Sequence, residues 1–487
     1  MSLLGLDLGT SGVRAVAVDH AGRELAGAAR STTLARPGPG LVETDTEEVL
    51  AASIAVLAEV AAHPAVRADP PEALSFSVQG EAVVPVGADG VARAPAPVSM
   101  DRRGAALAAR VAAELGEDTI QRITGQPAHP MFSVYKVAGW TGATGLRCLG
   151  DYVAARLGAR PAIDTSMAAR TGTYDVDAGA WSAAILGATG VDERLLPEVV
   201  APGTVVGKLT TAIDGLVAGL PLVAGAHDQA AAYLGGGGRT GERSVVSFGS
   251  SDCLTVGTTA RPRALVGTGL ATYAMGSSGW LTLAGTAAGG WALDWFARLT
   301  GGDPDELFEQ AASEPPRVLV LPYFAGSGTL DNDPLARGAV VGLDLNTSRE
   351  DLARAFLESF GFEIRKIVAA LGERDIDPGA VHAVGGGARS SRSLGIRASA
   401  AGRPLTPVRG NASARGAALL AGVGLGLYPS IDALPAPDAG PALTPDPATT
   451  DWYAAQARRF RDLYPTLIPH DRSYPETPDL PETKEQP

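Results

Sequence analysis

The chain has 487 residues, more than one hydrophobic core usually supports, and this length predicts two large domains. Hydrophobic residues make up 45% and charged residues 19% of the sequence, which excludes a disordered or membrane-embedded protein. There are 40 Lys and Arg against 53 Asp and Glu, and the formal net charge of −13 argues against a nucleic-acid partner.

The two cysteines, Cys148 and Cys253, are too few for a disulfide framework or a thiolate metal cage and fit a reducing compartment. No secretory signal is evident, because the start of the chain lacks basic residues and Asp7 interrupts its apolar run. Residues 264–293 carry no formal charge, but their seven glycines make them a poor membrane helix. We therefore expect a cytoplasmic protein without a membrane partner.

Three successive strands are predicted at the start of the chain, LLGLDL, VRAVAVD and ELAGAAR, with turns at LGTSG and HAGR. Thr44 and Glu47 then have the spacing of a capping box, and EEVLAASIAVLAEVAAH predicts an alanine-rich helix that ends near Pro64. ALSFSVQ follows as another strand. This order of strands and helix favours an α/β layer over a sandwich.

The middle of the chain repeats the opening pattern. PLVAGAHDQAAAYLGGGG predicts a short strand, a break at His227-Asp228 and a small helix. RSVVSFGSSDCLTVGTTA then predicts a strand, a Gly-Ser-Ser turn and a second strand, as at the N-terminus. The repetition predicts two domains of related design, each with a glycine-hydroxyl turn at one shared cleft. A chance likeness of two glycine-rich hairpins is the alternative.

Three helices and one strand are predicted after residue 340. Ser348 and Asp351 open a long helix whose apolar stripe runs from Leu352 to Leu371. AVHAVGGGARS predicts a strand, a triple-glycine turn and a helix, and NASARGAALLAGVGLG predicts a helix of small residues that can pack closely. The Pro-rich, charged residues 466–487 predict a disordered tail.

Three glycine turns follow predicted strands: Gly9-Thr10-Ser11, Gly249-Ser250-Ser251 and Gly385-Gly386-Gly387. Main-chain N–H groups in such turns can hold phosphate oxygens, and Arg14 adds positive charge beside the first turn. With Asp7 and Asp228 at strand ends, the turns indicate a nucleotide cleft. The alternative is a plain hairpin in which Asp7 bonds to the local backbone.

The sequence lacks the other common nucleotide-binding and metal-binding motifs. GTVVGKLT is not a P-loop, because three residues instead of four separate Gly203 from Gly207 and Leu209 replaces the hydroxyl residue. GVGLG near Gly424 lacks the preceding strand of a dinucleotide fold. The six histidines show no zinc-binding spacing.

Seven blocks resemble, in the same order, the FGGY family of carbohydrate kinases: GLDLGTSGVRAVAVD, VQGEAVVPV, MDRRG, AGAHDQAAAYLGGG, PYFAGSGTLDNDPLARGAVVGLDL, AVGGGARS and ASARGAALLAGVGLGLY. The resemblance runs from Leu3 to Tyr464. It implies an α/β fold of two ribonuclease-H-like domains, the superfold of actin and sugar kinases, around an ATP cleft. Residues 1–240 are then expected to bind sugar and phosphate, and residues 241–465 to bind the nucleotide.

The resemblance also implies roles for single residues. Contacts to ATP and its phosphates are implied at Gly9, Thr10, Ser11, Arg14, Gly249, Ser250, Ser251, Thr286, Gly290, Gly385, Gly386, Gly387, Ala388 and Arg389. Contacts to the sugar are implied at Gln79, Glu81, Asp101, Arg102 and Asp228, and contacts to Mg²⁺ at Asp7 and Asp228. Asp228 matches the catalytic aspartate.

The chemistry of an aspartate at this position supports that role independently. Phosphoryl transfer needs positioned reactants, neutralised charge and one group that accepts the hydroxyl proton. The alternative for Asp228 is a helix N-cap before QAAAYL. Likewise, Glu81 and Asp101 have the alternative of being solvated charges. For His129, beside Pro130 and Met131, a structural role is favoured and a contact to the sugar is the alternative.

We expect an ATP- and Mg²⁺-dependent kinase that phosphorylates a primary hydroxyl of a small linear sugar, with a pentulose such as xylulose first. QGE is closer to glycerol kinases, MDRRG suits pentulose kinases, and HPMFS is similar to gluconate and fuculose kinases, so gluconate, fuculose, glycerol and erythritol stay open. Ser327 to Leu330 replace the Glu-Arg-Thr-Pro of many members. An actin-like chaperone or filament protein is the distant alternative, and a homodimer is compatible with the sequence.

Overall fold

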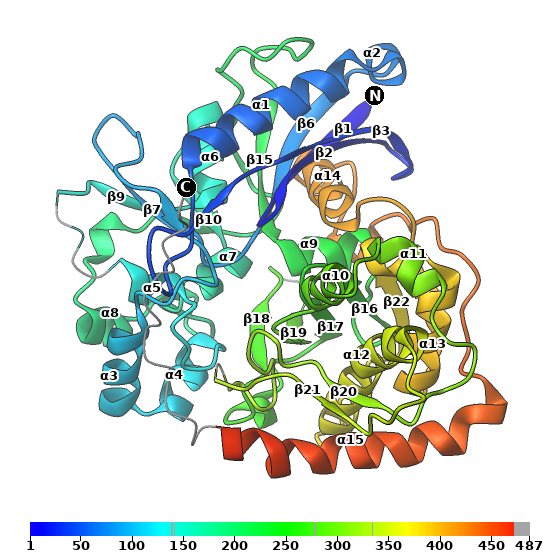
Figure 1. Cartoon of the computed structure of the whole chain (residues 1–487). Helices are drawn as coiled ribbons and strands as arrows, with labels where there is room; N and C mark the ends of the chain where they lie inside the picture. Colours follow the sequence, from blue (N-terminus) through cyan, green and yellow to red (C-terminus); the bar gives the residue numbers. More distant parts are fainter. Residues whose placement is uncertain (138–139, 141, 277–278, 334, 472–487) are drawn as a thin grey trace, which may run out of the picture.

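The computed structural model describes residues 1–137, 140, 142–276, 279–333 and 335–471. Two six-stranded sheets form its framework (Figure 1). The first sheet has the order β14 (Val205–Lys208), β15 (Pro221–His227), β6 (Pro71–Val78), β1 (Ser2–Gly9), β2 (Gly12–Asp19) and β3 (Glu24–Ser31). The second has the order β18 (Ala271–Ala274), β19 (Trp280–Gly285), β17 (Asp252–Thr258), β16 (Arg243–Phe248), β22 (Ala380–Val384) and β23 (Leu405–Pro407).

The two sheets share one pairing scheme. In the first, β1 pairs antiparallel with β2 and parallel with β6; in the second, β16 pairs antiparallel with β17 and parallel with β22. The central strand β1 is buried along nearly its whole length, which fits its mostly apolar sequence, and the apolar residues of β16, Val245, Val246 and Phe248, are buried as well. The repetition predicted from the sequence therefore reflects a repeated topology.

Helices cover both sheets. Those of the N-terminal half are α1 (Thr46–Ala62), α2 (Pro64–Ala68), α3 (Ala105–Leu115), α4 (Glu117–Thr124), α5 (Ser133–Lys136), α6 (Leu149–Leu157), α7 (Thr165–Arg170), α8 (Ala183–Thr189) and α9 (Asp228–Gly235). Those of the C-terminal half are α10 (Gly290–Leu299), α11 (Pro304–Glu309), α12 (Arg349–Gly372), α13 (Ser391–Ala401), α14 (Ala412–Gly424) and α15 (Thr450–Asp471).

A long insertion between β6 and β15 carries much of the candidate site. It holds α3 to α8 and the short strands β7 (Val83–Val86), β8 (Ala96–Pro97), β9 (Gly145–Cys148), β10 (Ala162–Asp164), β11 (Tyr174–Asp175), β12 (Ala180–Trp181) and β13 (Glu198–Val200). The other short strands are β4 (Leu34–Ala35), β5 (Glu43–Thr44), β20 (Leu319–Leu321) and β21 (Ala339–Val341).

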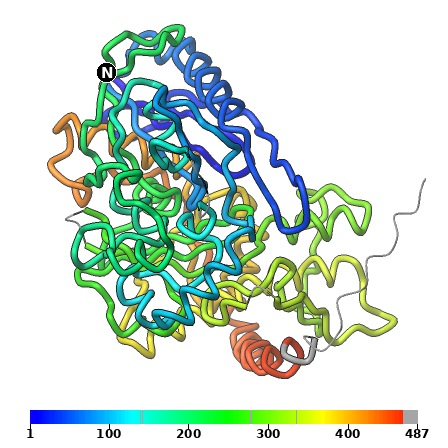
Figure 2. The backbone as a smooth tube through the Cα atoms, turned by 90° about the vertical axis from the view of Figure 1, so that its left-hand side faces the viewer, coloured from blue at the N-terminus to red at the C-terminus, as the bar shows by residue number. Residues whose placement is uncertain are grey.

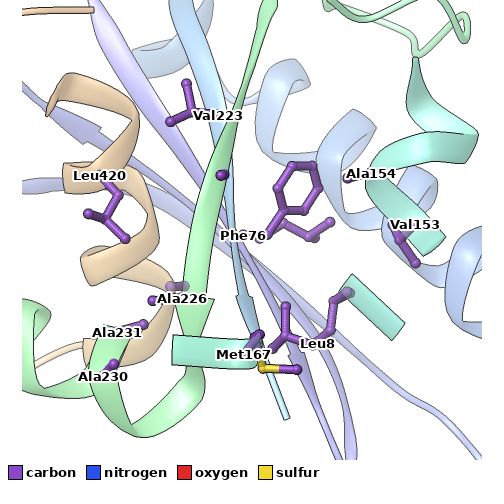
Figure 3. Packing of buried hydrophobic residues seen from close by; sticks show 14 of the residues in the cluster. Leu8, Phe76, Val153, Ala154, Met167, Val223, Ala226, Ala230, Ala231 and Leu420 are labelled. Atoms are coloured by element: carbon purple, nitrogen blue, oxygen red, sulfur yellow. The ribbon is translucent and has the colours of Figure 1, made fainter. Parts of the chain in front are cut away.

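Helix α14 packs on the first sheet although it follows the second in the chain. Its Leu420 lies beside Val223 and Ala226 of β15, while Phe76 and Ala154 fill the opposite face of the strand (Figure 3). The small residues allow very close packing: a Cβ on Gly416 would lie only 1.9 Å from the carbonyl oxygen of Ala231 in α9. The predicted close-packing helix is thus confirmed, and it anchors α9.

Two predicted helix boundaries can be compared with the structure. The Ser348–Asp351 capping box of α12 is present with both of its hydrogen bonds. The predicted Thr44–Glu47 box is wrong: Asp45 is the N-cap of α1 and accepts hydrogen bonds from the N–H groups of Glu47 and Glu48. The carboxylate of Asp45, one residue after Thr44, reaches two N–H groups of the first helical turn that have no partner within the helix.

The start of the predicted disordered tail is helical, because α15 continues to Asp471; the remainder of that prediction, residues 472–487, lies outside the described residues. Helix α15 and the N-terminus lie at opposite ends of the molecule (Figures 1 and 2). Among the helices of the described residues, none combines the length and the apolar character needed to cross a membrane.

Candidate active site

Asp228 lies between the two sheets, at the start of α9 directly after β15. Its side chain is 27% exposed. Burial, together with the negative charges of Asp7 and Glu81, raises the pKa of Asp228 to about 7, while Arg170 acts in the opposite direction. His227, not Asp228, occupies the N-cap position of α9, so the cap alternative does not describe this aspartate.

Asp7 lies on the central strand β1, opposite Arg14 on β2. The Ser77 hydroxyl donates to its Oδ1 at 2.7 Å, and Arg14 Nη1 lies 3.7 Å from its Oδ2. Burial raises the pKa of Asp7. Since the charge of Asp7 also raises the pKa of Asp228, the two carboxylates repel each other, and a divalent cation would relieve that repulsion.

Glu81 faces the same region from the loop after β6, with a backbone φ of 67°. Arg170 Nε donates to Glu81 Oε1 at 2.5 Å, and its Nη1 donates to Gln126 Oε1 at 2.7 Å. The guanidinium also lies 5.0 Å from the centre of the Phe132 ring. Glu81 is therefore a buried, paired carboxylate, and the alternative of a solvated charge is wrong.

A neutral histidine, His129, and the cation Lys136 lie next to the Glu81–Arg170 pair. His129 is half-buried, and partial burial together with the positive charges of Arg102, Arg170 and Lys136 lowers its pKa to about 4. Lys136 Nζ donates to the carbonyl oxygens of Glu81 and Val98 at 3.2 and 2.8 Å. His129 thus lies near Arg170, which pairs with Glu81, and its Nδ1 accepts the Met131 N–H at 3.1 Å.

Asp101 is buried, and its carboxylate bonds to other residues of the chain. Its side chain has no exposed area, its Oδ2 accepts the Val42 N–H at 2.8 Å, and its Oδ1 accepts Arg103 Nε at 2.8 Å. In this structure the Asp101 carboxylate holds the loop, and its neighbour Arg102 is exposed; the sugar contact of Asp101 stays a prediction. The solvated-charge alternative is wrong.

The first glycine turn, Gly9 to Ser11, joins β1 to β2. Thr10 Oγ1 donates to Gln79 Oε1 at 2.9 Å, which links the turn to the loop that holds Glu81. Among the described residues, the main-chain N–H groups of Thr10 and Ser11 have no protein acceptor. These donors are the feature expected of an anion-binding turn.

The second turn, Gly249 to Ser251, is held by the start of α10. The N–H groups of Gly289 and Gly290 donate to the carbonyl oxygens of Ser250 and Gly249, each at 2.8 Å. Thr286 N–H donates to the Asp252 carbonyl oxygen at 2.9 Å, and Thr286 Oγ1 accepts the Asp252 N–H at 3.3 Å. Thr286 and Gly290 therefore shape the wall behind the turn.

The third turn lies against the end of β16. Gly385 has a φ of 88°, and a Cβ on it would lie 2.5 Å from the Phe248 carbonyl oxygen. Arg397 Nη1 donates to the Gly387 carbonyl oxygen at 2.6 Å, and its guanidinium stacks 4.5 Å from the centre of the Phe248 ring. Gly386 to Ala388 form a short 3-10 helix that ends at Arg389. Because Gly385 and Gly387 lie against Phe248, the residue before Gly249, the second and third turns are neighbours.

The segment that departs from the common family pattern packs beside this wall. Thr329 N–H donates to the Gly285 carbonyl oxygen at 2.8 Å, and Thr329 Oγ1 accepts the Gly285 N–H at 2.9 Å. Leu330 has a φ of 92°. Ser327 to Leu330 therefore form part of the support of Thr286 at the end of β19.

Several functional candidates escaped the sequence analysis. Arg170 reaches Glu81 from the insertion and Gln126 accepts a hydrogen bond from Arg170, while His227 contacts Asp228 and Tyr273 reaches His227 from β18. Burial and Arg170 lower the pKa of His227 well below its ordinary value, so the imidazole is neutral. No local spacing marks these residues, since contacts between distant segments bring them together; only the position of His227 beside Asp228 was a signal.

Comparison with known proteins places this geometry in a family. The chain matches the N-terminal domain of the FGGY family of carbohydrate kinases over residues 2–235 and the C-terminal domain over residues 244–425. It is 31% identical over 457 residues to a glycerol kinase of Rhodospirillum rubrum, with 88% of this chain and 91% of the relative covered.

Solved structures agree. A xylulose kinase from Rhodospirillum rubrum has a TM-score of 0.84 and 27% identity, covering 97% of this chain and 100% of that structure. A Plasmodium falciparum glycerol kinase solved with ADP has a TM-score of 0.82 over 96% of this chain and 98% of its own; at 18% identity it shows the fold alone. The chain belongs to the FGGY family of carbohydrate kinases, phosphotransferases that act on an alcohol group of the acceptor.

Proposed function

We propose that this kinase transfers the γ-phosphoryl group of ATP to a primary hydroxyl of a small linear polyhydroxy acceptor, with Asp228 as the base. The observation that carries the proposal is the position of Asp228: its carboxylate is partly exposed, between the Glu81–Arg170 pair on one side and Asp7 of the first sheet on the other. Residues 1–240 then supply most acceptor contacts and residues 241–465 most nucleotide contacts.

The glycine turns fit the phosphates of ATP. Each phosphate turn has two main-chain N–H groups, those of Thr10 and Ser11 and those of Ser250 and Ser251, without an acceptor in the described part of the chain. Such N–H groups hold phosphate oxygens, and Arg14, whose side chain is 41% exposed, adds charge at the first turn. Gly385 to Arg389 are the proposed adenosine side.

Mg²⁺ also fits this site. No group of three or more metal-ligating side chains occurs among the described residues, but Mg²⁺ bound with a nucleotide needs only one or two carboxylates besides phosphate oxygens and water. Asp7 and Asp228 are the carboxylates proposed to hold it. When bound, the ion neutralises charge that develops on the transferred phosphoryl group.

The residues of the chain divide the chemistry as follows. Glu81, with Arg170 and Gln126, gives the acceptor pocket a fixed set of hydrogen-bonding groups, and Gln79 connects that pocket to the first phosphate turn. The acceptor oxygen forms a bond to the γ-phosphorus, the bond from that phosphorus to the ADP oxygen breaks, and Asp228 takes the hydroxyl proton.

A pentulose such as xylulose is the first proposed acceptor, supported by the structural likeness to a xylulose kinase over 97% of this chain. Glycerol is the second, supported by the 31% identity to a glycerol kinase and by Glu81 two residues after Gln79. Gluconate, fuculose and erythritol follow from the sequence pattern alone. Binding of one small uncharged polyol or ketose would suit a pocket whose buried charges Glu81 and Arg170 neutralise each other.

The test measures ADP production with Mg²⁺ and ATP against xylulose, ribulose, glycerol, erythritol, fuculose, rhamnulose and gluconate, with a control that lacks acceptor. One acceptor clearly above the control supports the proposal and identifies the substrate. Asp228→Asn is the matched variant, since it keeps the size of the side chain and removes its ability to accept a proton. An active Asp228→Asn enzyme with undiminished kcat would refute the assignment of the base.

A further inference from the structure

The carboxylate of Asp228 contacts the buried side chain of His227, which in turn contacts the buried side chain of Tyr273. His227 Nε2 lies 3.3 Å from Asp228 Oδ1, and His227 Nδ1 lies 2.9 Å from the Tyr273 hydroxyl. Tyr273 has no exposed area and stands on β18, the edge strand of the second sheet. The two rings meet edge to face, with centroids 5.8 Å apart and an angle of 88°. The series of side-chain contacts from Asp228 through His227 to Tyr273 thus crosses from one half of the molecule to the other.

The imidazole of His227 has little freedom to turn. Its main-chain N–H donates to Ser166 Oγ at 2.8 Å, and Ser166 Oγ donates in turn to Asp164 Oδ1 at 2.5 Å. On the other side, a Cβ on Gly80 would lie 2.9 Å from His227 Nε2 and 3.4 Å from Arg170 Nε. Glycine between Gln79 and Glu81 therefore makes room for the ring, and the ring fills that room.

Only one tautomer of a neutral imidazole satisfies both contacts when Asp228 is ionised. If the Tyr273 hydroxyl donates to Nδ1, Nε2 carries the hydrogen, and this nitrogen lies 3.3 Å from Asp228 Oδ1. The other tautomer would place the Nε2 lone pair against a negatively charged oxygen. A contact of 3.3 Å is within the range over which such bonds tighten once the reactants are bound.

We propose that His227 is a positioning residue for Asp228, and that Tyr273 sets its tautomer from the second sheet. His227 then orients the carboxylate so that one oxygen faces the acceptor hydroxyl while the other is held. The inference rests on the proposed role of Asp228 as the base and adds a contribution of the nucleotide-side sheet to proton transfer.

Tyr273→Phe is the first variant, because it removes the hydroxyl and keeps the buried ring. We expect kcat to fall on the order of tenfold, as for other groups that orient a functional side chain, with unchanged KM for ATP and acceptor. Tyr453→Phe is the matched control: it removes another buried hydroxyl, one that donates to Glu358 at 2.7 Å, and kcat should not change. In an Asp228→Asn background, Tyr273→Phe should cause no further loss.

A second measurement does not depend on turnover. Nitrogen NMR of wild-type protein labelled at histidine, with the His227 signals assigned by their loss in His227→Gln, should show hydrogen on Nε2 and none on Nδ1. Hydrogen on Nδ1, an unchanged kcat in Tyr273→Phe, a raised KM for the acceptor at unchanged kcat, or additive losses in the double variant would each overturn the inference. A wild-type protein that phosphorylates no acceptor would instead overturn the proposed function, and with it this inference.

Discussion

Arg170→Met tests how the acceptor side of the site is held together. The Arg170 guanidinium is nearly buried and donates to Glu81 and Gln126, so its removal leaves the enclosed Glu81 carboxylate without its cation. Methionine keeps an unbranched side chain in this space but has no guanidinium to lie over the Phe132 ring. Removing one partner of a buried ion pair lowers the free energy of unfolding by about 3–5 kcal/mol, because the other charge stays buried without compensation. We expect a loss of that size for Arg170→Met.

The measurement is urea unfolding followed by circular dichroism, with unfolding free energies extrapolated to water. Arg30→Met is the control: Arg30 Nη2 lies 3.3 Å from Glu59, but the two side chains are 51% and 57% exposed, so the loss should stay below about 1 kcal/mol. The double variant Glu81→Gln with Arg170→Met should regain about 1–3 kcal/mol over Arg170→Met, because no uncompensated charge remains. Equal losses for Arg170→Met and Arg30→Met, or no recovery in the double variant, would refute the reasoning.

The remaining predictions concern catalysis, pH and helix capping. Asp228→Asn should lower kcat by about 100-fold or more while calorimetry shows ATP binding retained, since only the proton acceptor and its charge are lost; loss of ATP binding would contradict this. Burial raises the pKa of Asp151 to about 8, so between pH 4 and 8 the unfolded chain releases a proton that the folded protein keeps, and stability falls as pH rises. Asp151→Asn should flatten that profile in urea midpoints measured at pH 5 and 8, and an unchanged slope would count against it. Ser348→Ala should cost about 1 kcal/mol in the same assay by removing the capping box of α12, and a neutral effect would contradict that role.

The sequence was sufficient where structure depends on neighbouring residues. The apolar runs of β1 and β16 predicted buried strands, and the short turns after them followed from glycine and hydroxyl residues. The start of α1 shows the limit of such reasoning. Thr44 and Asp45 are both able to cap a helix, and the choice depends on which side chain reaches the N–H groups of the first turn.

The candidate site was only partly predictable, because several of its contacts join distant segments. Arg170 follows Glu81 by 89 positions and Gln126 by 44, and no periodicity connects them. Asp101 was assigned to the sugar by its motif, but Arg103, two residues further on, encloses its carboxylate. A charged residue of a motif can therefore support a loop while its neighbour is exposed, and the motif alone does not distinguish the two.

The position of Asp228 depends on both sheets, because both of its neighbours in the chain bond to strands of the second sheet. Gln229, the next residue, accepts a hydrogen bond from Ser247 of β16 at 2.7 Å. His227, the preceding residue, bonds to Tyr273 of β18, and Gly416 of α14 holds α9 from behind. Any rotation of one sheet against the other must carry these bonds along or break them. The geometry of the carboxylate is consequently coupled to the relative placement of the two halves through the contacts of Gln229 with Ser247 and of His227 with Tyr273.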